Sequence, residues 1–162
     1  MARHLSHSRY LQMDKKLGLI FKDFLTAAEE ATSKQDEWIM IDQAHAHLDD
    51  LSSHDYPQVL QRILTLIEKY PELDYGGPGP FGSFLETQTV GAYSLELVAS
   101  LQRQPSVQVL GWLDRTMRMD ESQRTADGGI EPSYYAEVLT TVLQHPMASE
   151  NCKSFARMCV EE

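Results

Sequence analysis

The closest spacing of histidine and aspartate in this sequence lies within residues 42–55, where it could serve metal-dependent hydrolysis. If the segment is helical, Asp42, His45 and Asp49 follow one another at i, i+3 and i+7 and can share one face. A hydrolytic metal site needs three such ligands, an open position for water and outer hydrogen bonds that orient the ligands. His47, two residues after His45, points away from this face, and a solvated acidic helix face accounts for the same residues. We therefore expect no metal and no cofactor, and we keep a helical metal-dependent hydrolase as an alternative interpretation.

Residues for nucleophilic catalysis are no better arranged. The sequence contains neither a Gly-x-Ser-x-Gly elbow nor a phosphate-binding loop, and the segment around Ser83 lacks the framing glycines. Cys152 and Cys159 are seven residues apart, which on a helix separates them by roughly 10.5 Å along the axis, too far for a disulfide. We expect two free thiols, no catalytic residue and no enzymatic activity.

The chain is acidic, and its charge is unevenly distributed. Its formal net charge is −10. Within residues 1–22, five basic side chains against Asp14 alone give a net charge of +4, so the remainder carries −14. A body this acidic repels phosphate backbones and attracts basic proteins. We therefore expect a basic protein partner and no direct contact with nucleic acid.

Two groups of carboxylates are the candidate binding residues. The first lies within residues 36–55, which contain no Lys or Arg, and the second begins at residue 120. The candidates are Asp36, Glu37, Asp42, Asp49, Asp50, Asp55, Asp120 and Glu121. Such runs are also typical of a solvated helix face, and that interpretation stays open at this point.

Nothing in the sequence predicts a membrane segment. No stretch approaches the roughly 18 consecutive apolar residues that would cross a bilayer. The basic N-terminus also lacks the apolar core of a signal peptide. We expect a cytoplasmic protein that makes no contact with a membrane.

The length of 162 residues favours a single domain over residues 1–162, in which residues 1–9 could form a flexible basic arm.

Apolar residues recur with helical spacing along nearly the whole chain, and no segment alternates like a strand. Helices are predicted over about 10–32 and 91–103, with others beginning after Ser33 and near Asp55, Pro80, Pro105, Pro132 and Ser149. In the second helix, Trp38 belongs to the apolar stripe, and Asp36 and Glu37 to the first turn. The sequence therefore predicts an all-α fold of seven or eight helices in antiparallel pairs, as a bundle or a HEAT-like stack.

Two segments, residues 73–86 (LDYGGPGPFGSFLE) and residues 105–115 (PSVQVLGWLDR), carry a resemblance to a known family. They resemble a helical family of bacterial immunity proteins that accompany contact-dependent growth inhibition and related polymorphic toxins. The likeness extends loosely over residues 55–120. Ser83 stands where the family's first motif has a histidine, and Asp114 stands where the second has an asparagine.

The resemblance implies an immunity protein that binds and neutralises a cognate toxin, often a nuclease in this family, inside the cell that makes it. The acidic charge fits the same function, because covering a basic active-site cleft needs a complementary surface and no chemistry. A HEAT-like scaffold or adaptor without a toxin partner is a further interpretation, beside the hydrolase.

Overall fold

The computed structural model describes residues 2–162, with side chains described at positions 8, 9 and 11–162. Within this part of the chain the regular secondary structure is entirely helical, and the predicted all-α fold is confirmed. The helices are α1 (Ala2–Lys34), α2 (Trp38–Ser52), α3 (Tyr56–Lys69), α4 (Gly79–Leu85), the 3-10 helix η1 (Val90–Ala92), α5 (Ser94–Arg103), α6 (Val107–Met117), α7 (Glu121–Arg124), α8 (Pro132–Gln144) and α9 (Glu150–Glu161). None of them is long and apolar enough to cross a membrane.

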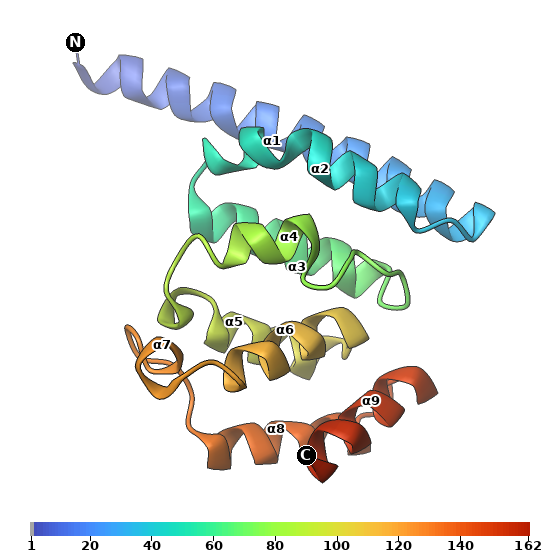
Figure 1. Ribbon diagram of the computed structural model, residues 1–162. Coiled ribbons are helices and arrows are strands. Elements are labelled where there is room, and N and C mark those ends of the chain that lie inside the picture. The colour runs from blue at the N-terminus through green and yellow to red at the C-terminus, as the bar shows by residue number, and fades with distance from the viewer. Residues whose placement is uncertain (1) are drawn as a thin grey trace.

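The helices stack in two layers. Figure 1 shows the stack extending from α1 and α2 at one end to α8 and α9 at the other, with the two termini at opposite ends. In one layer, α1 contacts α3, α3 contacts α5 and α5 contacts α8; in the other, α2 contacts α4 and α6 contacts α9. The pairs α1–α2, α5–α6 and α8–α9 join the layers. The core therefore lies between the layers along the whole length of the stack.

Side-chain caps and prolines begin helices where the sequence predicts them. Asp55 caps α3 and Ser149 caps α9, each by accepting a hydrogen bond from the amide three residues further on. Ser106 caps α6 in the same way, one residue after the predicted start. α8 begins at Pro132, where the missing N–H and fixed φ of proline suit a first helical position.

α1 is longer than predicted at its N-terminal end. The helix begins at Ala2 instead of near residue 10, so the backbone of residues 2–9 continues it. Met1 and the side chain of Arg3, which contribute to the basic N-terminal segment, lie outside the described residues. Flexibility of residues 1–9 stays a prediction.

α2 begins later than predicted, and its buried stripe includes Ala44 and Leu51 as predicted but not Trp38. Its first residue is Trp38, so Asp36 and Glu37 precede the helix, and Asp36 accepts a hydrogen bond from the amide of Trp38 at 3.1 Å. Trp38 is 61% exposed, and its predicted place on the buried stripe is wrong. The buried face is centred on Met40 and Ala44, and the helical period of 3.6 residues turns Trp38 to the opposite side.

Aromatic rings join the N-terminal pair to the middle of the stack. Phe24 of α1 and Phe81 of α4 are fully buried and meet edge to face, with ring centroids 5.3 Å apart. Phe81 also contacts Tyr75, whose hydroxyl donates a hydrogen bond to the carbonyl of Tyr70 at 3.0 Å. Burial raises the pKa of Tyr75, so this hydroxyl keeps the proton that it donates. The core thereby fixes the segment that leads into α4.

Trp112 anchors the same region from α6. It is 4% exposed, and its indole Nε1 donates a hydrogen bond to the carbonyl of Pro78 at 2.9 Å. Val109 and Leu113, on the same face of α6, are fully buried. The tryptophan therefore combines a large buried surface with one directional bond.

We expect Trp112→Ala to lower the free energy of unfolding by about 3–5 kcal/mol, the usual cost of removing a buried tryptophan. Trp112→Phe keeps most of the bulk but leaves the Pro78 carbonyl without its donor, which typically costs about 1–3 kcal/mol. Urea unfolding followed by circular dichroism measures both. An alanine variant as stable as the parent would show that Trp112 does not anchor the core.

Candidate functional site, a groove over α6

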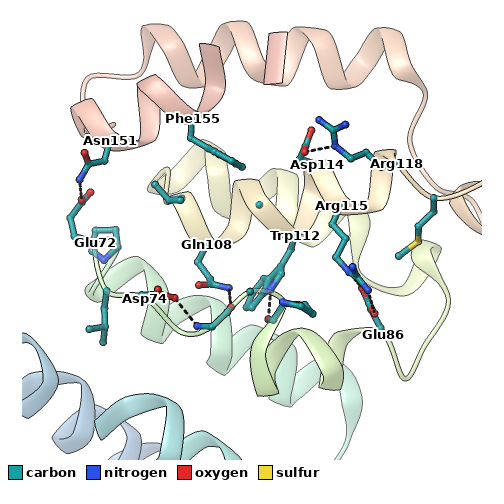
Figure 2. Close-up of a pocket in the computed structure, with 18 of the residues that line it drawn as sticks. Glu72, Asp74, Glu86, Gln108, Trp112, Asp114, Arg115, Arg118, Asn151 and Phe155 are labelled. Atoms are coloured by element: carbon teal, nitrogen blue, oxygen red, sulfur yellow. Dashed lines mark hydrogen bonds and ion pairs between the residues drawn. The ribbon is translucent and has the colours of Figure 1, made fainter. Parts of the chain in front are cut away.

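An open groove of about 1050 Å³ runs over α6. Figure 2 shows the turn that precedes α4 on one side and α9 on the other, with α6 between them. Residues of α6 and its C-terminal end line the floor from Val107 to Arg118, a length of roughly 16 Å at the helical rise of about 1.5 Å per residue. Asn151 and Phe155 line the opposite wall from α9.

α6 holds the turn before α4 in place by side-chain hydrogen bonds. Gln108 accepts a hydrogen bond from the amide of Tyr75 at 3.1 Å and donates one to the carbonyl of Gly76 at 2.7 Å. Trp112 adds its bond to Pro78, also visible in Figure 2. Gly76 has a φ of +90°, which residues with a side chain rarely adopt. The two segments that carry the family resemblance therefore meet along one wall and the floor of the groove.

Ion pairs lie toward the α4 and α8 side of the groove. Arg115 binds both carboxylate oxygens of Glu86, at 2.6 and 3.2 Å. Asp114 accepts hydrogen bonds from Arg118 at 2.8 Å and from the hydroxyl of Tyr135 at 2.7 Å. Burial opposes the ionisation of Asp114, but the bonds from Arg118 and Tyr135 outweigh it, so the pKa of Asp114 lies below its usual value. The two arginines are therefore compensated within the protein.

Two carboxylates at the other end of the groove form no ion pair with a described side chain. They are Glu72 and Asp74, and both are exposed. Asp74 accepts a hydrogen bond from the amide of Gly76 at 2.8 Å, and Glu72 accepts one from the side chain of Asn151 at 3.4 Å. The groove thus has one acidic end and one end whose charges are paired.

A smaller hollow of about 620 Å³ lies on the other side of the same turn. Asp36 and Glu37 line it from the connection between α1 and α2, together with Glu72 and Asp74. Lys69 is the cation among the lining residues. The structure therefore places two of the predicted binding residues beside the acidic end of the groove.

Two further predicted residues, Asp42 and Asp49, lie on the exposed side of α2 with Trp38 and His45. This is the face on which the hydrolase interpretation depends. Across the described residues, no group of three or more His, Cys, Asp or Glu side chains could hold a metal ion. The structure thus gives the hydrolase no support, and the face is a stripe of carboxylates beside a large exposed aromatic ring.

The remaining predicted residues serve local structure. Asp50 lies 3.6 Å from the imidazole Nδ1 of His47. Asp55 and Asp120 accept the capping hydrogen bonds of α3 and α7, and Glu121 occupies the first turn of α7. These side chains are spread over both ends of the molecule, so the eight predicted residues do not form one site.

Neither cysteine offers a reactive thiol. Cys152 and Cys159 are free and buried, as their spacing predicts. Burial raises the pKa of Cys152 to about 11, and a thiol is a weak nucleophile without its thiolate form. The pKa of Cys159 is also raised, chiefly by burial.

Sequence reasoning missed residues that only the packing brings to the groove. Glu72, Arg118 and Phe155 come from three parts of the chain, and no local pattern connects them. The spacing in α9 assigns Phe155 to the buried face with Cys159, yet Phe155 is half-buried and lines the groove. No signal in the sequence marks these three residues, because they lie outside residues 73–86 and 105–115, which carry the family resemblance.

No protein-family model, curated protein or solved structure matches this chain. The likeness to immunity proteins therefore rests on the two segments that meet at the groove. The site itself is an open groove between helical pairs of the stack.

We expect the stabilising effect of the Asp114 carboxylate to depend on pH. Because its folded-state pKa is depressed, this contribution is present above the unfolded pKa, near 3.8, and is lost as the pH falls through the folded pKa. Asp114→Asn should therefore destabilise the protein at pH 7, and the difference from the parent should shrink at pH 3. Urea unfolding at both pH values measures it, with the exposed Asp49→Asn as the control. A difference that stays constant with pH would contradict this role.

Proposed function

We propose that this chain is an immunity protein that binds a basic protein toxin, such as a nuclease, and blocks its active-site cleft. The observation that carries the proposal is the meeting of residues 73–86 and 105–115 at one open groove. These are the segments that resemble the immunity family. Blocking of this kind needs shape and charge complementarity without chemistry, and the groove with its acidic end offers both.

The charge of the protein supports a basic partner. The net charge is −10, and a field of this sign accelerates the encounter with a cationic cleft. Asp42 and Asp49 on α2 are exposed and form no ion pair within the described part of the chain. Glu72 and Asp74 add two more such carboxylates at the groove. We assign the α2 pair to long-range attraction and the groove to contact with the toxin.

A helical adaptor is the second candidate, and the stacked architecture favours it. Stacks of helical pairs present extended surfaces that bind other polypeptides. The two functions differ in the partner, because an immunity gene lies beside the gene of its toxin. Expression of the neighbouring gene should arrest growth, and co-expression of this chain should restore it. If no neighbouring product is toxic, the adaptor becomes the better proposal.

We expect Asp42→Lys with Asp49→Lys to slow association with the toxin by roughly tenfold at low salt. The dissociation rate should change little, because these residues attract the toxin without contacting it. Stopped-flow or surface-plasmon kinetics at low and high salt measure both rates, and the difference should fade as salt screens the charges.

Glu29→Lys with Glu137→Lys is the matched control, since it changes the net charge equally at exposed sites on α1 and α8 in the other layer. It should slow association less than the α2 variant. Equal effects of both variants would show that the association rate depends on the net charge of the protein and not on the position of the carboxylates on α2.

A further inference from the structure

Gly111 lies in the interior of α6 and on the floor of the groove. Glycine is the poorest helix former apart from proline, so its presence there calls for a reason. A Cβ atom at this position would have no neighbour within 4 Å, and therefore tight packing is not that reason. The backbone conformation does not require glycine either, because φ lies in the ordinary helical region.

Gly82 in α4 shows the contrasting case. A Cβ atom there would lie 2.7 Å from the Cβ of Pro78 and 3.0 Å from the indole Nε1 of Trp112, so the fold itself excludes a side chain. At Gly111 no protein atom occupies the space that a side chain would fill, and the glycine exposes its backbone to the groove. This arrangement suits a ligand that approaches the helix closely.

The dimensions and charges of the groove indicate what this ligand is. The floor is roughly 16 Å long, which matches about five residues of extended chain at about 3.3 Å each. Half-buried Val107 and Phe155 offer apolar contact beside Gly111. Glu72 and Asp74 need a cation at one end, whereas the arginines of the groove are already paired. An extended basic segment fits these features, and an acidic one would be repelled.

We propose that the groove receives an extended basic segment of the toxin, which lies along α6 over Gly111 and directs lysine or arginine side chains to Glu72 and Asp74. This inference rests on the proposed function and specifies where the toxin is held. It places the specific contacts in the groove and not on the acidic face of α2.

The two tryptophans of the chain report on the two surfaces separately. Trp112 lines the groove, and Trp38 lies on the exposed face of α2. In ¹⁵N-labelled protein, addition of catalytically inactivated toxin should shift the indole N–H signal of Trp112 and leave that of Trp38 in place. Among overlapping fifteen-residue peptides covering the toxin, those that shift the Trp112 signal should be basic.

Filling the groove tests the same inference by substitution. Gly111→Phe should weaken toxin binding at least about tenfold, while Ala136→Phe, on an exposed position of α8, should not. Gly111→Ala should raise the melting temperature, because alanine is the better helix former and meets no obstacle. Glu72→Lys should weaken toxin binding by reversing a charge and without filling the groove. This variant therefore tests the inference even if Gly111→Phe does not fold.

The outcomes separate this inference from the proposed function. If the parent protein neither binds the toxin nor protects against it, the proposed function fails and the inference fails with it. If the parent binds and protects, but the folded Gly111→Phe and Glu72→Lys variants bind equally well, only the groove assignment is wrong. A shift confined to the Trp38 signal, or the lack of any basic peptide that shifts Trp112, would also overturn the assignment.

Discussion

The hydrogen bonds from α6 to the turn before α4 are the constraint on which the middle of the stack depends. Gln108 satisfies an amide and a carbonyl of the turn, and the buried indole of Trp112 satisfies a third group at Pro78. Such groups would be costly to leave without partners once the turn is enclosed by protein. The same bonds set the separation of α4 and α6, and with it the position of the groove wall.

The turn is also fixed from its other side. Tyr75 packs on Phe81, and Phe81 packs on Phe24, so aromatic contacts link the turn to α1 at the far end of the core. The turn is therefore held by both hydrogen bonds and buried rings. In the proposed function, a turn held in this way would lower the entropic cost of binding a partner through Glu72 and Asp74.

Carboxylates in this protein divide into those with a structural role and those without one. Asp55 and Asp120 cap helices, and Asp114 is held between Arg118 and Tyr135. Removal of any of these affects stability first. Asp42, Asp49, Glu72 and Asp74 have no ion pair among the described side chains. Uncompensated charges of one sign repel one another in the folded protein, and in the proposed function these four carboxylates would act on a basic partner.

The sequence alone determined the helices, because helix formation follows from local spacing and local caps. Asp55, Ser149 and Pro132 each mark a helix start through groups within a turn of themselves, and the buried stripes follow from a period of 3.6 residues. The apolar spacing assigned Trp38 to the buried stripe of α2, but the helical period turns it away from Met40 and Ala44 and toward solvent. Local rules also cannot tell a structural carboxylate from an unpaired one, because the sequence alone does not distinguish Asp120, which caps α7, from Asp49, which is exposed.

The groove was decided only by tertiary packing. Glu72, Gly111 and Phe155 are brought together by contacts between helices distant along the chain, and no pattern within any one helix encodes those distances.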